Sequence, residues 1–359
     1  DMVKGTVAEL ENGAPKEGIT LVLKTPYASS YQHSHHMRFR KWRNSMNLHK
    51  HREEFEELIA ISADYIGVPA DAVRRDYYIV QMMQNLQNSE YAEACVFKGG
   101  TSLSKCYPGS INRFSEDIDL TFIPVEDMNN KKYSRALKRI ENTISAGFLM
   151  EKIEAERNDR NKSAYVWPEN ESRETCRIKL EIGSSVRPDP FSKRSMKTYI
   201  QEYLDAKGMH NVVEEFDLQE VNVNTLDITR TFLDKVMSVK RHAICGTLPG
   251  KVRHIYDVTV LLDRSDIQKF LKDTEHLKQL LSLTKETDSL YLQKRNISEE
   301  YDPMRAYAFE NWKQYFNDEI RNRYETLHED LLYTSDRQSF KKAIQAFEFI
   351  SQLFASIGE

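Results

Sequence analysis

At residues 98–105 the chain reads KGGTSLSK, and at residues 113–120 it reads RFSEDIDL. Two glycines allow a tight turn and a close approach of the backbone to a ligand, and the start of the following helix offers N–H groups to a phosphate. On an extended strand, alternation places Asp117 and Asp119 on one face and the apolar residues between them in the core. Two such carboxylates can jointly hold Mg²⁺, which prefers oxygen ligands and bridges to phosphates. The two motifs together predict a phosphate cradle beside a metal-binding carboxylate pair.

In this order the motifs resemble the signature of the polymerase-β nucleotidyltransferase superfamily, in which Gly-Gly or Gly-Ser precedes a helix and an Asp-x-Asp strand. With Arg113, Phe114 and Ser115 leading into the acids, the string is similar to the AbiEii/AbiGii-type toxin nucleotidyltransferases. Gly-Gly alone is typical of an ordinary turn, and Asp-x-Asp alone of a solvated strand end. The resemblance implies an α/β (α+β) fold, with a mixed polymerase-β-type sheet, flanking helices and a C-terminal α-helical lobe.

The composition limits the classes of function. The chain has 359 residues, 40% of them hydrophobic, and a net charge of −4, so it has no overall basic field and any RNA contact must be local. Its four cysteines lack metal-ligand spacing and indicate reduced, structural thiols in a cytoplasmic protein. No apolar run approaches the length of a membrane span, so we expect no membrane partner.

Three regions are expected along the chain. Residues 1–49 are expected to form a partly irregular N-terminal arm, residues 50–225 the nucleotidyltransferase core, and residues 226–359 an α-helical domain. The arm contains one strand candidate, residues 19–23, and a histidine cluster, residues 33–36, which is interpreted as a polar loop. In the core, periodicity predicts helices at about 50–66, 70–86, 102–107 and 131–146, and strands at 94–97, 118–122, 163–167 and 176–182.

Strand 176–182 carries a third acid. Alternation places Arg177, Lys179 and Glu181 on one face and apolar residues on the other. In the superfamily an acid on a neighbouring strand commonly completes the metal site, so Glu181 is the candidate third carboxylate. The alternative is a surface acid paired with Lys179 or with a cross-strand base.

A helix-like segment, residues 229–241, is followed by KVRHIYDV at residues 251–258. This order resembles the family's acid-Lys helix and its later basic-x-x-Tyr-Asp motif. By position, Lys235 corresponds to the family's functional lysine and Asp257 to its functional aspartate. Lys235 is expected to neutralise charge on the leaving phosphates, and Asp257 to orient either that lysine or the acceptor hydroxyl. The alternative for Lys235 is an ordinary exposed helix lysine.

The chain departs from the family pattern at one of these positions. The family usually shows Glu before the lysine and an acid three residues before the aspartate. Here Asp234 keeps the first charge, whereas His254 replaces the second acid. A carboxylate role at the position of His254 is therefore not expected.

The remaining candidates surround the nucleotide. The glycine turn and the first residues after it are expected to bind the β- and γ-phosphates through backbone N–H and hydroxyl groups. Ser115 corresponds to the family's functional serine, with a loop serine that caps the next turn as the alternative. Lys98 and Lys105 are expected as exposed phosphate ligands, with solvated lysines as the alternative. The predicted set is: catalytic and metal-binding Asp117, Asp119 and Glu181; catalytic Lys235 and Asp257; and nucleotide-binding Lys98, Gly99, Gly100, Thr101, Ser102, Lys105 and Ser115.

The resemblance implies a toxin of a bacterial toxin–antitoxin, abortive-infection or phage-defence system. It predicts transfer of NMP from an NTP, with Mg²⁺ or Mn²⁺, to an RNA acceptor such as the 3′ end of tRNA, and a cognate antitoxin as partner. Basic runs at residues 38–52, 187–197 and 240–254 favour RNA weakly, with ordinary solubilising surface as an equal alternative. Two alternatives stay open: nucleotidylation of a protein hydroxyl, and a non-catalytic NTP-binding module that acts through a partner.

Overall fold

The computed structural model describes residues 46–124, 128–184, 187–292, 298, 300–330, 332, 334 and 337–358. They belong to one compact unit, Ser45–Glu359. The strand candidate at 19–23 and the histidine cluster at 33–36 lie outside the described residues. Met46 and Leu48 are fully buried, so the packed part of the chain begins before the predicted boundary at residue 50.

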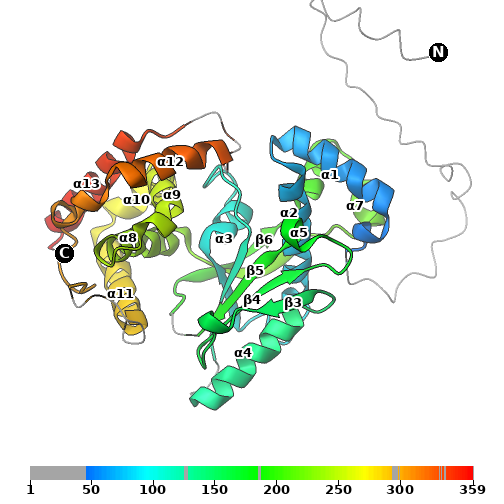
Figure 1. Cartoon of the computed structure of the whole chain (residues 1–359), viewed down its shortest axis with the longest axis horizontal. Coiled ribbons are helices and arrows are strands. Elements are labelled where there is room, and N and C mark those ends of the chain that lie inside the picture. Colours follow the sequence, from blue (N-terminus) through cyan, green and yellow to red (C-terminus); the bar gives the residue numbers. More distant parts are fainter. Residues whose placement is uncertain are drawn as a thin grey trace, which may run out of the picture. The chain divides into compact units, whose positions relative to one another are not determined.

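The centre of the fold is a mixed sheet with the strand order β3-β4-β5-β2-β1-β7-β6 (Figure 1). β2 runs antiparallel to β1 and parallel to β5, and β1 runs parallel to β7. The strands are β1 Cys95–Lys98, β2 Asp117–Phe122, β3 Leu149–Lys152, β4 Asn161–Trp167, β5 Ile178–Gly183, β6 Phe191–Met196 and β7 Val221–Leu226. The predicted mixed α/β fold is confirmed.

The sequence reasoning found β1, β2, β4 and β5 and missed the other three strands. β3 and β6 lie at the two edges of the sheet, where most of their side chains are exposed. An edge strand lacks the apolar alternation that marks a strand with a buried face. In β7 the sequence VNVNTL alternates, but two asparagines weaken its strand composition.

The two faces of the central strands differ in chemistry. On one face Ile118, Leu120 and Leu180 are buried and join helices α2 and α4 in a single hydrophobic core. On the other face Asp119 and Glu181 lie side by side in register. The helices of this half are α1 Arg52–Ile66, α2 Ala70–Gln87, α3 Gly99–Cys106, α4 Asn130–Ile144, α5 Arg173–Cys176, α6 Tyr199–Ala206 and α7 His210–Glu215.

After β7 the described chain is helical, as predicted. α8 contacts α9 and α11, and α12 and α13 pack on α9 (Figure 1). The helices are α8 Ile228–Ile244, α9 Val252–Leu262, α10 Ser265–Lys272, α11 Thr274–Leu292, α12 Asp318–Asp330 and α13 Phe340–Ser356. Trp312 and Tyr324 are buried in the core of this helical half.

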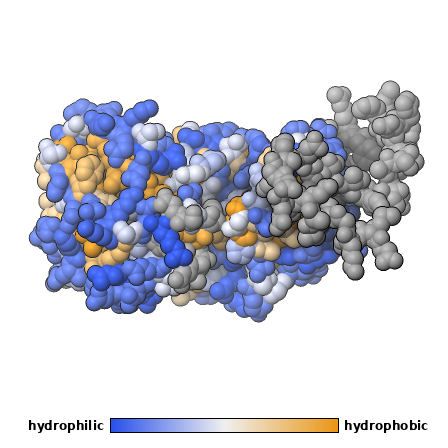
Figure 2. Space-filling model, turned by 90° about the horizontal axis from the view of Figure 1, so that it is seen from above, coloured by the Kyte–Doolittle hydropathy of each residue, from blue (hydrophilic) through white to orange (hydrophobic). Residues whose placement is uncertain are grey.

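Polar surface dominates the face shown in Figure 2, and its apolar area gathers over the helical half of the unit, at the left of that view. In the described part of the chain, no helix combines the length and the apolar composition that a membrane crossing requires.

A buried ion pair fixes helix α3, which follows the glycine turn. The Nζ atom of Lys105 lies 2.7 Å from Oδ1 of Asp76 on α2 and 3.3 Å from Oε1 of Glu202 on α6, above the ring of Tyr199. Only 5% of Lys105 is exposed. The expectation of an exposed, phosphate-binding Lys105 is therefore wrong, because the ammonium group is committed to Asp76 inside the core.

We predict that Asp76→Ala lowers the free energy of unfolding by about 3 kcal/mol, because it leaves the Lys105 ammonium buried without its main partner. Asp64→Ala, which removes an exposed acid from α1, is the control and should change stability little. Urea denaturation measures both variants. Equal, small effects would show that the buried pair does not hold α3.

A second buried lysine lies in the helical half. The Nζ atom of Lys240 on α8 donates to the carbonyl oxygens of Ala306 at 3.1 Å and Arg305 at 3.4 Å. Burial, together with the nearby cations Lys285 and Arg305, lowers the pKa of Lys240 to about 8, and Asp302 opposes this shift. Lys240 is thus part of the core, although it belongs to a basic run that we considered for RNA binding.

The lowered pKa of Lys240 predicts a pH dependence. Between pH 8 and pH 10.5 the unfolded chain binds a proton that the folded chain has lost, so stability rises with pH in this window. Relative to Lys240→Met, the free energy of unfolding of the wild type should rise by about 3 kcal/mol across it. Urea denaturation at a series of pH values measures the difference, and Lys269→Met, at an exposed position of α10, should show no such trend.

Candidate active site

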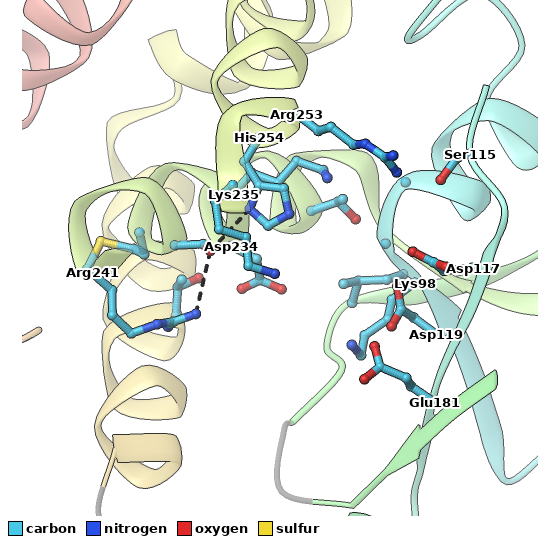
Figure 3. Close-up of a pocket in the computed structure, with 18 of the residues that line it drawn as sticks. Lys98, Ser115, Asp117, Asp119, Glu181, Asp234, Lys235, Arg241, Arg253 and His254 are labelled. Atoms are coloured by element: carbon cyan, nitrogen blue, oxygen red, sulfur yellow. Dashed lines mark hydrogen bonds between the residues drawn. The ribbon is translucent and has the colours of Figure 1, made fainter. Parts of the chain in front are cut away.

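A cavity of about 500 Å³ lies between the polar face of the sheet and helices α8 and α9. Figure 3 shows side chains that enter it from both sides. The sheet and the loop before β2 contribute Lys98, Gly99, Gly100, Arg113, Ser115, Asp117, Asp119, Glu181 and Leu226; the helical half contributes Thr231, Asp234, Lys235, Met237, Ser238, Arg241, Gly250, Lys251, Arg253, His254, Thr284, Thr287 and Asp288.

The acidic wall of the cavity follows from strand register. Asp119 pairs with Lys98 across β1 and with Glu181 across β5, so these three side chains share one face of the sheet. The expectation that Glu181 lies on a strand beside the two aspartates is confirmed. The alternative, an acid paired with Lys179, also holds for Glu181, because its Oε1 atom lies 3.1 Å from Nζ of Lys179.

The charge on this wall is incompletely balanced at Asp117. Burial and the neighbouring carboxylates Glu116 and Glu181 raise its pKa, while Arg253 opposes them. A bound cation would remove this penalty, and three carboxylates are the donor set that Mg²⁺ or Mn²⁺ prefers. Among the described residues, no three acidic, histidine or cysteine side chains are grouped closely enough to form a ready metal centre. The fit to a divalent cation therefore rests on donor chemistry and shared strand face.

The glycine turn is required by close contacts. Gly99 has φ +84°, and a Cβ atom there would lie 2.3 Å from Oδ2 of Asp119. A Cβ atom on Gly100 would lie 2.7 Å from Oγ of Ser115 and 2.8 Å from a guanidinium nitrogen of Arg113. The backbone at this turn therefore sits directly against the acidic wall, and Gly99 and Gly100, the first two residues of α3, line the cavity.

Two predicted phosphate ligands face away from the cavity. The hydroxyl of Thr101 donates to Oγ of Ser115 at 3.0 Å, and the hydroxyl of Ser102 donates to the carbonyl oxygen of Gly99 at 3.0 Å. Both side chains are buried, and neither lines the cavity. The expectation that these hydroxyls bind phosphate is corrected: Thr101 positions Ser115, and Ser102 closes the first turn of α3.

The opposite wall is built on one buried carboxylate. Asp257 of α9 accepts from Nε and Nη2 of Arg113 at 2.6 and 2.7 Å, and its Oδ2 atom lies 2.8 Å from Nζ of Lys235. Burial alone would raise the pKa of Asp257, but the attraction of Arg113 and Lys235 outweighs it and holds the pKa below its usual range. Asp257 is fully buried and does not line the cavity, so of its two predicted roles the structure favours the orientation of Lys235.

Further cations on this wall were not assigned to the site from sequence. Lys251, Arg253 and Arg241 line the cavity together with Lys235. Arg113, quoted as part of the motif but given no role, joins them from the loop before β2. The available signal was the KVRH string of residues 251–254, which opens the motif that resembles the family and belongs to the basic run 240–254 considered for RNA contact.

His254 lines the cavity where the family usually has an acid. Its Nδ1 atom lies 3.1 Å from Oγ of Ser238 on α8. Burial and the nearby cations Lys235 and Lys251 hold its pKa well below the usual value, so the imidazole is neutral at pH 7. The loss of the acid leaves the basic wall more positive, because no carboxylate offsets Lys235 from this position.

We predict that Gly99→Ala costs about 1 kcal/mol or more of stability beyond that of Gly109→Ala. Both glycines have positive φ, but a Cβ atom on Gly109 meets nothing within 4 Å, so the control carries the same backbone strain without the contact to Asp119. Urea denaturation compares the two variants. Equal losses would contradict the close packing of the turn on the acidic wall.

Comparison with known proteins gives one family match. The model of the family described as "Nucleotidyl transferase AbiEii toxin, Type IV TA system" matches residues 81–347. Among solved structures, one similar chain is the nucleotidyltransferase toxin MenT4 from Mycobacterium tuberculosis H37Rv, with a TM-score of 0.41 and 17% identity over 83% of this chain and 98% of that chain. No curated protein sequence matches this chain.

Proposed function

Because this chain belongs to the AbiEii family of nucleotidyltransferase toxins of type IV toxin–antitoxin systems, we propose that it transfers NMP from an NTP to an RNA hydroxyl, with Mg²⁺ as the metal. The acceptor hydroxyl releases its proton to solvent and its oxygen bonds to the α-phosphorus, while the bond from that phosphorus to the oxygen that bridges to the β-phosphate breaks and pyrophosphate leaves. The observation that carries the proposal is one cavity with carboxylates on one wall and a cluster of cations on the other.

The acidic wall supplies the metal ligands in this proposal. Asp117, Asp119 and Glu181 would hold the cation, which would activate the attacking oxygen and neutralise the phosphates. The backbone of Gly99 and Gly100 lies against these acids, so the phosphates would bind beside the ion at the first N–H groups of α3. Lys98, whose backbone pairs with that of Asp119, and Ser115 line the same side of the cavity and would contact the nucleotide.

The basic wall stabilises the leaving group. Lys235 faces the cavity while Asp257 fixes its ammonium from behind, so the cation is oriented before substrate arrives. Such preorganised charge stabilises a transition state better than a mobile side chain, because it needs no rearrangement during the reaction. Asp257 acts through Lys235 and Arg113 and is a positioning residue.

The choice of RNA as acceptor rests on cations that line the cavity, which belong to the basic run 240–254. It does not rest on the run 187–197. Lys193 is paired with Glu93 at 2.5 Å, and Lys197 with Asp205 at 2.9 Å. Each of these lysines already forms an ion pair with an acid. Positive charge is instead concentrated at Lys251 and Arg253 inside the cavity, where a 3′ end would bring its phosphates.

We further propose the 3′ end of tRNA as the acceptor and a block of translation in phage defence as the outcome. A cognate antitoxin is the partner that membership of a toxin–antitoxin family implies. Under this proposal the activity is toxic, because a tRNA with a modified 3′ end cannot be aminoacylated, and the antitoxin would protect the cell from it.

The test is incubation of the pure protein with Mg²⁺, each α-³²P-labelled NTP in turn, and total tRNA, followed by a denaturing gel that separates RNA from protein. Label on tRNA is expected. Asp119→Asn and Lys235→Met should each lower the rate about a hundredfold or more. Asp318→Asn, at an exposed position of α12, is the matched control and should retain full activity.

Label on protein alone would overturn the RNA acceptor and favour nucleotidylation of a protein hydroxyl. Undiminished transfer in Asp119→Asn would contradict the assignment of the acidic wall.

A further inference from the structure

The polar face of the sheet continues beyond the catalytic carboxylates. In register, Asp117 on β2 is opposite Lys179 on β5, and Lys179 is opposite Tyr165 on β4. Paired residues point to the same face, so Tyr165 shares the face of Asp117. Two strand spacings separate them, a distance of about 10 Å. β5, β4 and β3 lie side by side up to the edge of the sheet (Figure 1).

On this part of the face, two arginine guanidinium groups each lie near an aromatic ring. The guanidinium of Arg177 lies 5.0 Å from the ring centroid of Tyr165, and that of Arg173 lies 5.5 Å from the ring of Trp167. Trp167 is two residues beyond Tyr165 on β4, and therefore on the same face. We call the four residues Tyr165, Trp167, Arg173 and Arg177 the aromatic sheet face.

The aromatic sheet face is accessible. Tyr165 and Trp167 are half-buried, whereas Arg173 and Arg177 are exposed. Beside Trp167 on β3, Leu149 is 42% exposed.

The charge of this surface is carried mainly by Arg177. Arg173 forms an ion pair with Glu151, and Lys179 lies 2.9 Å from Glu156. Within the described ranges no acidic side chain forms an ion pair with Arg177. A nucleic-acid strand that lies across this face would therefore meet the two rings and a guanidinium that forms no ion pair within these ranges.

We propose that the aromatic sheet face binds the single-stranded 3′ end of the RNA acceptor and leads its terminal hydroxyl to the acidic wall. The inference rests on the proposed transfer to RNA. Unpaired bases stack on aromatic rings and on guanidinium planes, and a sheet presents such groups in rows. The row from Asp117 through Lys179 to Tyr165 joins this surface to the reaction site without a break.

The direct test is binding of a fluorescein-labelled single-stranded RNA of roughly eight nucleotides, measured by fluorescence anisotropy without NTP. Trp167→Ala and Arg177→Ala should each raise the Kd about tenfold, whereas Trp167→Phe keeps a ring and should retain most of the binding. Arg321→Ala is the matched control. It removes an arginine that lies 5.7 Å from the ring of Phe340 on α13 and whose side chain is 51% exposed.

In the tRNA labelling assay the same two alanine variants should raise KM for tRNA and leave KM for the NTP unchanged, since the nucleotide binds at the cavity. Thermal unfolding of each variant confirms that it is folded. A merely structural role would lower kcat or stability without separating the two KM values.

The possible failures are distinct. In one outcome tRNA is labelled in an Asp119-dependent reaction, but Trp167→Ala and Arg177→Ala bind the oligonucleotide as the wild type does. The RNA-binding role of the aromatic sheet face is then overturned, and the proposed function stands. A duplex that binds the wild type as tightly as the single strand would also overturn it, because paired bases cannot stack on the face. If label appears on protein alone and the oligonucleotide does not bind, both proposals fall.

Discussion

The arrangement of this site depends on the buried carboxylate of Asp257. It holds Arg113, from the loop that leads into β2, and Lys235, from α8, within hydrogen-bonding distance at the same time. One group on α9 thereby ties the sheet to the helical half across the cavity. Removing a partner from such a buried network leaves uncompensated charge, which is costly, so the relative position of the two walls is strongly constrained.

From this constraint follows a separation of charge. Carboxylates that share a strand face are kept opposite cations on α8 and α9, and the cavity between them is the site that we propose for the nucleotide and its metal ion. The neutral His254 increases the difference in charge between the two walls, because an acid at its position would offset the charge of Lys235. The glycine turn lets the backbone approach the acidic wall, where any side chain would displace Asp119 or Ser115.

Much of the fold was predictable because its signals are local. Alternation in β2 and β5 identifies buried strands, and the acids on their opposite face follow from the same period. Glu181 was placed beside the aspartates by this reasoning, and the register confirms it. Edge strands β3 and β6 were missed because exposed edges do not alternate. The prediction for Lys105 was wrong because its partner, Asp76, lies on another helix. The residues next to Lys105 in the sequence do not indicate that this ion pair forms.

The sequence by itself determined the family, the mixed α/β fold and the identity of the acidic wall, because these depend on motif order and strand period. Only the tertiary structure decided which lysine faces the cavity and which is buried, that Asp257 acts from behind Lys235, and that Thr101 and Ser102 serve the turn rather than the ligand. It also brought Tyr165 into line with Asp117 through strand pairing. These outcomes depend on partners distant in the chain, and the electrostatics of a buried group are set by those partners rather than by its sequence neighbours.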